Sequence, residues 1–304
     1  MNNPDSDKPG GKTGADPKGA RQRSPLALEP GLYVVATPIG NLRDITLRAL
    51  DILGSVSRVY AEDTRVSRTL LDAYGLKPKL GAYHEHNAEG AREEILAALA
   101  AGESVALISD AGTPLISDPG FKLTRAVIEA GHRVFPAPGA SALLAALVAS
   151  GLPSDRFLFA GFAPAKAQAR REAFIDLAEI DATLILYETG PRLAESLAEM
   201  ASVFGPRPAA VARELTKMFE ETRREILDVL AAHYAEAGGP KGEIVVVIGP
   251  PPPAAEIDDN ALDAFLRAAL TRGSVKEAAR EAHERFGIGR KRAYARALTL
   301  RDGA

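Results

Sequence analysis

Residues 103–141 read ESVALISDAGTPLISDPGFKLTRAVIEAGHRVFPAPGAS and contain the strongest local signal in the chain. A short apolar run at Val105–Ser109 precedes a loop crowded with glycine, proline and aspartate. An amphipathic helix over Phe121–Ala130 and a second apolar run at Arg133–Pro136 follow. This order of strand, loop, helix and strand is typical of a parallel α/β sheet. In such sheets ligands bind beyond the carboxyl ends of the strands, which is where the loop Ile108–Gly120 begins.

The same alternation extends over most of the chain. Further short runs rich in Val, Ile and Leu predict strands at Leu32–Ala36, Phe157–Gly161, Thr183–Glu188, Ala209–Glu214 and Glu243–Gly249. Helices are predicted at Glu93–Ala101, Ser141–Ser150, Lys166–Glu179, Arg192–Phe204 and Glu225–Tyr234. This pattern predicts an α/β fold whose sheets are mainly parallel and covered on both faces.

Changes in composition divide the chain into five segments. They are a disordered tail (1–30), an N-terminal α/β domain (31–152), a second α/β domain (153–249), a proline-rich linker (250–259) and a helical module (260–304). The tail has no apolar periodicity, and four consecutive prolines exclude a helix or sheet interior in the linker. In the module, a capping box of Ser274 and Glu277 and a basic last helix predict a small helix-turn-helix-like unit.

Charge and cysteine content narrow the function classes. The chain has no cysteine, which excludes disulfides, thiolate metal sites and a catalytic thiol. Residues 31–260 carry a net charge of −9, whereas residues 261–304 hold ten basic and five acidic residues. A basic C-terminal module suits a polyanion, although such a charge run is about as often a solvated helix face. Without an apolar N-terminal segment or an unbroken apolar span, we expect no membrane association and a cytoplasmic protein.

Two further loops follow predicted strands. ATPIGN (Ala36–Asn41) ends the first strand, and PAPGAS (Pro136–Ser141) leads into a helix whose N-terminus favours a carboxylate or phosphate. Neither loop matches the P-loop or the dinucleotide-binding glycine pattern. Taken alone, each loop is more often a turn than a binding site.

The motifs taken together and in order carry more information. They are VATPIGNLRDIT, AEDTRVSRTLL, HEHN, ISDAGTPLISDPG, PAPGAS, FAGFAP, YETGPRL, RELTKMFEE and KGEIVVVIG. The set closely resembles the tetrapyrrole methylase superfamily, and within it the branch that methylates a cytidine ribose 2′-oxygen in 16S rRNA. The resemblance covers about residues 31–249, and the C-terminal module is similar to the extra domain of that branch.

The resemblance implies a fold, a cofactor and a set of binding residues. The fold is two α/β domains with S-adenosylmethionine in the cleft between them, usually in a homodimer. By motif, the implied cofactor-binding residues of the first domain are Pro38, Asp110, Ala111, Gly112, Pro114, Ile116, Ser117, Asp118, Gly139, Ala140 and Ser141. Those of the second domain are Tyr187, Glu188, Arg213 and Gly242.

Polar residues of three other motifs are candidates for the catalytic work on a ribose hydroxyl, which is a weak nucleophile. We select Asp63, Arg65, His86, Asn87 and Lys217, from a wider group that includes Glu62, His84, Glu85 and Glu220. The structural alternatives are a salt bridge at a helix start for Glu62–Arg65 and ordinary core or surface histidines. Arg43, Arg65, Arg68 and Lys217 are candidate phosphate contacts. His84 and His86 would face one side of an extended segment, but a third ligand at suitable spacing is missing, so we predict no metal.

These inferences combine into one functional hypothesis with two rivals. The hypothesis is an S-adenosylmethionine-dependent methyltransferase of the cytidine ribose in small-subunit rRNA, acting on the assembled 30S subunit. The rivals are a tetrapyrrole C-methyltransferase of the same fold and a non-catalytic nucleic-acid-binding factor. The basic module would have no role in a tetrapyrrole C-methyltransferase. The cofactor loops would have no role in a non-catalytic binding factor.

Overall fold

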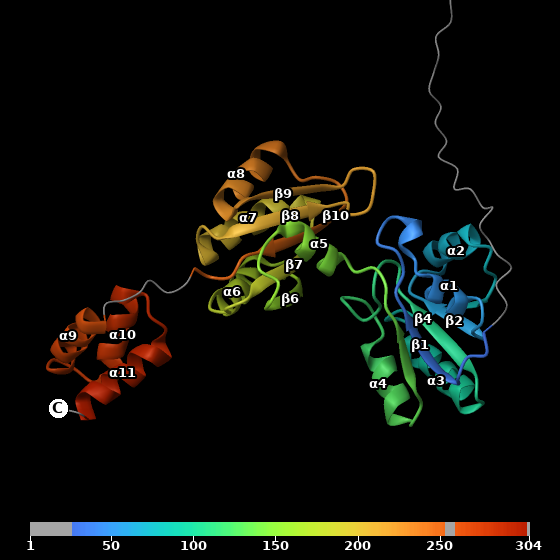
Figure 1. Cartoon of the computed structure of the whole chain (residues 1–304), viewed down its shortest axis with the longest axis horizontal. Coiled ribbons are helices and arrows are strands. Elements are labelled where there is room, and N and C mark those ends of the chain that lie inside the picture. Colours follow the sequence, from blue (N-terminus) through green and yellow to red (C-terminus); the bar gives the residue numbers. More distant parts are fainter. Residues whose placement is uncertain (1–25, 253–258, 303–304) are drawn as a thin grey trace, which may run out of the picture. The chain divides into compact units, whose positions relative to one another are not determined.

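A computed structural model describes residues 26–252 and 259–302 (Figure 1). Most of the predicted tail and the middle of the predicted linker lie outside these residues. The chain divides into two compact units, one made of residues 1–177 and 182–249 and the other of residues 178–181 and 250–304. The first unit holds both sheets and the second holds the C-terminal helices.

The first sheet is entirely parallel. Its strands are β1 (Gly31–Val35), β2 (Arg58–Ala61), β3 (Lys79–Ala82), β4 (Ser104–Ile108) and β5 (Val134–Ala137). They are ordered β3-β2-β4-β1-β5, with β1 between β4 and β5. Because all five strands run the same way, the loops that follow β1, β4 and β5 leave the same edge of the sheet.

Helices cover both faces of this sheet, as the sequence predicted. They are α1 (Leu47–Leu53), α2 (Thr64–Ala73), α3 (Ala88–Ala100) and α4 (Phe121–Glu129), with a 3₁₀ turn at Leu42–Asp44 before α1. Alternate strand residues point to opposite faces. Ala106 and Ile108 therefore join the core under α1 and α2, and Val105 and Leu107 join the core under α3 and α4.

The second sheet is mixed, so the expectation of mainly parallel sheets is wrong for this half. Its strands are β6 (Phe157–Phe162), β7 (Thr183–Thr189), β8 (Pro208–Arg213), β9 (Glu221–Ile226) and β10 (Glu243–Ile248). They are ordered β6-β7-β10-β8-β9, and only the β6–β7 pair is parallel. The cause is a short hairpin between β8 and β9, which returns the chain without a crossover helix.

Four helices accompany the second sheet. They are α5 (Ala142–Ser150), α6 (Ala167–Ala178), α7 (Gly190–Phe204) and α8 (Leu227–Ala237). Leu143, Ala146 and Leu147 of α5 pack on β7, β8 and β10, in a core that also includes Ile39 from the loop after β1. That core joins the two halves of the unit. The predicted helix start at Glu225 is wrong, because Glu225 belongs to β9 and pairs with Ala209.

The C-terminal unit contains α9 (Asp259–Leu270), α10 (Val275–Phe286) and α11 (Arg290–Asp302). The predicted capping box is confirmed, since Ser274 and Glu277 satisfy each other's backbone N–H groups. The three helices share an apolar core that includes Leu262, Leu266 and Ala282. In the part of the chain that the structure describes, no helix has the length and apolarity needed to cross a membrane.

Candidate functional site

The loops after β1 and β4 are tied together at the edge of the first sheet. The Thr37 N–H donates to the Gly112 carbonyl at 2.8 Å, and the Gly112 N–H donates back to the Thr37 carbonyl at 3.1 Å. The Thr37 hydroxyl, which is buried, donates to the Ser109 carbonyl at 3.1 Å. Two loops far apart in sequence therefore form one rigid surface.

The loop after β4 has an unusual backbone. Gly112 has φ +79°, and two non-glycine residues, Leu115 (φ 75°) and Ser117 (φ 64°), also adopt the left-handed region. Such conformations cost free energy for residues with a side chain, and they concentrate at functional sites. A Cβ added at Gly112 would approach Ile39 Cγ2 at 3.3 Å, in addition to the strain of its positive φ.

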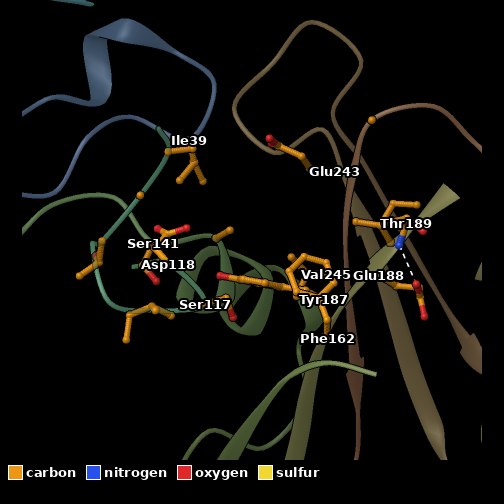
Figure 2. A pocket seen from close by; sticks show the side chains of 17 residues that line it. Ile39, Ser117, Asp118, Ser141, Phe162, Tyr187, Glu188, Thr189, Glu243 and Val245 are labelled. Carbon is orange, nitrogen blue, oxygen red and sulfur yellow. Dashed lines mark hydrogen bonds between the residues drawn. The ribbon is translucent and has the colours of Figure 1, made fainter. Parts of the chain in front are cut away.

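This loop forms one wall of a cavity of about 250 Å³, which we call the first cavity. Nine of the predicted cofactor-binding residues line it: Ala111, Gly112, Ile116, Ser117, Asp118, Ser141, Tyr187, Glu188 and Gly242. Figure 2 shows Ile39, Ser117 and Asp118, from the loops after β1 and β4, on one side and Tyr187 and Val245 of the second sheet on the other. The structure therefore brings together, around one cavity, residues as far apart in the sequence as Ile39 and Val245.

Aromatic side chains form much of the second-sheet wall. The Tyr187 ring lies edge-on to Phe159 and Phe162, with ring centroids 4.8 Å and 5.4 Å away. Figure 2 shows the Tyr187 ring extending across the cavity toward Ser117 and Asp118. Burial raises the pKa of Tyr187, and the charges of Asp118 and Glu243 raise it further, while the Leu143 backbone N–H lowers it. The phenol is therefore neutral and able to donate a hydrogen bond at physiological pH.

The first cavity is also electrostatically negative. Burial raises the pKa of Asp118 to about 6, with further contributions from the charges of Glu62 and Asp110. The pKa of Glu62 is raised in turn by burial and by the charge of Asp110. Clustered carboxylates of this kind favour a cation between them, because a positive charge relieves their repulsion.

Glu188 holds the wall in place. Its side chain is buried and accepts hydrogen bonds from Ser196 Oγ at 2.6 Å and from the Thr189 N–H at 2.8 Å. Arg192 Nε lies 3.5 Å from the same carboxylate. These contacts fix the junction of β7 and α7, so Glu188 acts as a positioning residue beside the cavity.

A second cavity, of about 330 Å³, adjoins the first. Both cavities are lined by Ile39, Ala111 and Glu243. The second also contains Pro38, Asp110 and Lys217 from the predicted set, and Val66, Ser67 and Thr69 from α2. A molecule in the first cavity and one in the second would therefore meet at a shared wall.

Lys217 is the cation of the second cavity's lining. Its ammonium lies 3.0 Å from Glu214 Oε1 and 2.9 Å from Glu243 Oε2. Burial lowers its pKa, but the hydrogen bonds to Glu243 and Glu214 outweigh burial, and the pKa lies above the ordinary lysine value. Lys217 is therefore charged at physiological pH.

The other predicted catalytic residues are placed differently. Asp63 is the N-cap of α2, its side chain accepts from the Arg65 N–H, and its own N–H donates to Asp110 Oδ1 at 2.9 Å. Arg65 and Asp63 form the salt bridge at a helix start that was the structural alternative for this motif. The hydrogen bonds from Arg65 lower the pKa of Asp63 to about 2. His86 is exposed and lines neither cavity.

HEHN forms a turn, whereas the sequence pattern placed His84 and His86 on one side of an extended segment. Asn87 makes this turn, because its Oδ1 accepts from the His84 N–H at 2.8 Å and its Nδ2 donates to the Ala82 carbonyl at 2.9 Å. Across residues 26–252 and 259–302, no group of three His, Asp or Glu side chains is arranged to hold a metal ion.

Four predicted cofactor-binding residues line neither cavity: Pro114, Gly139, Ala140 and Arg213. Ala140 acts through its carbonyl, which accepts from the Thr113 hydroxyl at 3.1 Å. Arg213 pairs with Glu221 at 3.2 Å. Residues of the first cavity that sequence reasoning did not select are Ile39, Thr113, Ala142, Phe162, Thr189, Glu243, Ile244 and Val245. Several of these residues lie inside the motifs quoted above, so membership in a motif was the sequence signal that could have identified them.

The two α/β sheets and the cavity lined from both of them define an α/β protein with a candidate small-molecule site, and comparison with known proteins gives the family. The family model described as Tetrapyrrole (Corrin/Porphyrin) Methylases matches residues 31–231. The chain belongs to this family. A second model, described as the RsmI C-terminal HTH domain, matches residues 256–301.

Curated relatives are similar over nearly the whole chain. The chain is 54% identical to ribosomal RNA small subunit methyltransferase I of Mesorhizobium japonicum, over 90% of this chain and 94% of that protein. It is 43% identical to the protein of the same name from Escherichia coli O157:H7, over 88% of this chain and 94% of that protein.

Solved structures share the fold of the α/β unit. Uroporphyrin-III-C-methyltransferase from Thermus thermophilus is 22% identical with a TM-score of 0.53, and covers 72% of this chain and 94% of that one. The cobalt precorrin-4 methyltransferase CbiF is 20% identical with a TM-score of 0.54, over the same shares.

Proposed function

We propose that this protein is an S-adenosylmethionine-dependent methyltransferase that methylates the ribose 2′-oxygen of a cytidine in small-subunit rRNA. The observation that carries the proposal is the match of both units to one kind of protein. The α/β unit matches the methylase model, the helical unit matches the RsmI C-terminal model, and relatives named ribosomal RNA small subunit methyltransferase I span both.

The first cavity fits the chemistry of the cofactor. S-Adenosylmethionine supplies a methyl group on a sulfonium, and it also carries a flat aromatic base and an ammonium group. The apolar side chains of Ile39, Phe162 and Val245 suit the base, and the carboxylate of Asp118 suits the positive charges. The open backbone at Gly112 leaves room for close approach.

The second cavity is the proposed position of the substrate ribose. Methyl transfer requires the oxygen nucleophile, the methyl and the leaving sulfur in line, and alignment of this kind supplies roughly 7–11 kcal/mol of a barrier. The wall shared by the two cavities would set that alignment. Lys217 is charged and lines the substrate side, so it can hold a phosphate or stabilise negative charge on the ribose oxygen.

Asp63, Arg65, His86 and Asn87 have supporting roles in this proposal. With its pKa near 2, Asp63 is too weak a base to take a proton from a hydroxyl. Asp63 and Asn87 instead fix the loops that hold Asp110 and the HEHN turn. Arg65 and His86 are exposed beside these loops, where they are candidate contacts for the rRNA strand.

The proposed partner is small-subunit rRNA within the assembled 30S subunit, with the C-terminal helices contributing to binding. We also propose a homodimer acting in the cytoplasm. A second candidate function is C-methylation of a tetrapyrrole, favoured by the similarity of the α/β unit to uroporphyrin-III-C-methyltransferase. The match of residues 256–301 to the RsmI C-terminal model weighs against this second candidate. The alignment with uroporphyrin-III-C-methyltransferase, by contrast, covers only 72% of this chain.

One experiment separates these functions. Calorimetry measures S-adenosylmethionine binding, and labelled methyl incorporation is then measured on undermethylated 30S subunits and on uroporphyrinogen III. We expect cofactor binding and transfer to the subunits alone. Gly112→Val is the control that should lose cofactor binding while staying folded, because a β-branched side chain is strained at positive φ. Transfer to uroporphyrinogen III alone, or rRNA binding without cofactor binding, would contradict the proposal.

A further inference from the structure

The hairpin between β8 and β9 presents two apolar side chains to solvent at its tip. Met218 is 90% exposed and Phe219 is 66% exposed. They directly follow Lys217, whose side chain lines the second cavity. Exposed apolar side chains beside a candidate substrate cavity indicate a binding surface rather than an ordinary solvated loop.

The hairpin is held firmly, although its tip is exposed. Lys217 pairs with Glu214 and Glu243 as described, and the Thr216 N–H donates to Glu220 Oε2 at 2.6 Å. The Thr216 hydroxyl accepts from the Asn41 N–H at 3.1 Å, which ties the hairpin to the loop after β1. The tip is therefore preorganised and needs little ordering when it binds.

The backbone of the hairpin is also strained. Glu214 has φ 50° and Thr216 has φ 65°, and the left-handed region is a real outlier for a β-branched residue such as Thr216. Strain of this kind persists only where the surroundings enforce it, and it is common where a loop holds side chains for a ligand.

Other residues of the second cavity's lining suit the same kind of ligand. Leu42 and Val66 line this cavity and are partly exposed, so the cavity offers exposed apolar side chains as well as the polar Ser67, Asp110 and Lys217. Arg43 and Arg68 are exposed on the neighbouring elements, and neither forms an ion pair among the residues that the structure describes. Apolar surface with free cations beside it suits single-stranded nucleic acid, whose bases stack and whose phosphates are negative.

We propose that Phe219, supported by Met218, is a stacking platform for a nucleobase of the substrate RNA at the mouth of the second cavity. This inference rests on the proposed function. A ribose can enter a cavity only if its nucleotide leaves the helical stack, and the base so exposed needs a new partner. Phe219 replaces the lost stacking and positions the ribose, which makes it a positioning and not a catalytic residue.

The test uses full-length Phe219→Ala, Phe219→Leu and Phe219→Trp variants. Phe121→Ala is the matched control, because Phe121 is also 66% exposed and lines neither cavity. Single-turnover methyl transfer is measured at saturating cofactor, over a range of 30S concentrations. Melting temperature, cofactor affinity and sedimentation velocity are measured for every variant.

We expect Phe219→Ala and Phe219→Leu to lower the transfer rate at least about tenfold even at saturating subunits, because stacking is lost in both. Phe219→Trp should stay within about threefold of the wild type, since its ring also stacks. Melting temperature, cofactor affinity and oligomeric state should be unchanged in all variants, and Phe121→Ala should match the wild type throughout.

Three results would overturn the inference. They are a normal rate for Phe219→Ala, a full rescue by Phe219→Leu, and dissociation of an oligomer by Phe219→Ala, which would make the tip a contact between two copies of the chain. Failure of the proposed function itself looks different, because the wild-type protein would then transfer no methyl group to 30S subunits.

Discussion

If S-adenosylmethionine occupies the first cavity as proposed, Asp118 links the charge of that cavity to cofactor binding. Its pKa of about 6 reflects burial first, then the charges of Glu62 and Asp110. A cationic ligand favours the ionised carboxylate, so binding should lower this pKa and release a proton. Cofactor affinity should therefore increase as the pH rises from about 5 to 7, below the range in which an α-amino group titrates.

Calorimetry in buffers of different ionisation enthalpy checks this prediction. We expect proton release on binding near pH 6 and a flat pH profile for Asp118→Asn. The cofactor-free Asp118→Asn variant should also melt at a higher temperature at pH 7.5. The raised carboxyl pKa lowers stability as the pH rises from the ordinary aspartate value of 3.8 to about 6, and this loss is complete at pH 7.5. Proton uptake on binding, or an affinity that falls with rising pH, would remove Asp118 from the cation site.

Lys217 provides the residue-scale test of the second cavity. We expect Lys217→Met, which keeps most of the aliphatic stem, to lower single-turnover methyl transfer at least about tenfold, because the cavity loses its lining cation. Cofactor affinity should change less than about threefold, a free-energy difference under roughly 1 kcal/mol. Glu214→Gln is the control, since it removes a partner of Lys217 but leaves the ammonium in place. Equal rates for Lys217→Met and the wild type would confine Lys217 to a structural role.

At the scale of elements, the junction of β7 and α7 supports the wall of the first cavity. A Cβ on Gly190 would lie 1.8 Å from the Pro240 carbonyl oxygen, which a backbone shift alone can relieve. We expect Gly190→Ala to displace the 239–243 segment, lowering both the melting temperature and the cofactor affinity.

Gly205→Ala at the other end of α7 is the matched control for Gly190→Ala. Its added Cβ meets nothing within 4 Å, although its φ of +74° is strained. The control should lose stability but keep cofactor affinity. Thermal unfolding and calorimetry on both variants decide the matter, and equal cofactor affinities would show that this contact does not shape the cavity.

The elements show why some of the fold was predictable. Strands β4 and β7 are buried apolar runs, which a sequence shows directly. The loop after β4 is predictable from its glycines, prolines and aspartates. Nine residues that line the first cavity were selected through such motifs. By contrast, β2 and β3 have four residues each and were missed. β9 reads ETRREI and is half-exposed at a sheet edge, so its sequence carries no apolar run.

Other features depend on contacts that no local pattern encodes. Val245 and Tyr187 reach the same cavity because β10 pairs antiparallel with β7 in a register that sets them side by side. Ile39 has the sequence context of an ordinary loop residue, and its role in the core depends on packing against the second sheet. The HEHN turn likewise depends on the two hydrogen bonds of Asn87.

At the scale of the whole molecule, the C-terminal helices have their own core. The basic helix α11 is partly neutralised within this unit, because Arg296 forms a two-pronged pair with Asp263 at 2.7 Å and Arg292 lies 3.4 Å from Asp259. Arg290 is exposed and forms no ion pair among the described residues, which makes it the better candidate for the proposed rRNA contact. Only part of the basic charge predicted for α11 is therefore free for the proposed contact with rRNA.

Removing residues 254–304 should leave the remaining protein folded and able to bind S-adenosylmethionine, since both cavities are lined by residues before position 250. We expect methyl transfer to 30S subunits to fall at limiting subunit concentration and to recover in part at saturation, because the loss is one of binding. An insoluble truncation, or one with full activity at every subunit concentration, would contradict the proposed division of labour.

The most direct test of the central claim is a map of ribose methylation along the small-subunit rRNA. Cells that lack this protein, cells that have it and cells with the Gly112→Val variant are compared nucleotide by nucleotide. We expect that a cytidine ribose loses its 2′-O-methyl group without the protein, and that the wild-type protein, but not the variant, restores it. An unchanged map, or loss of a methyl group on a base in place of a ribose, would contradict the account.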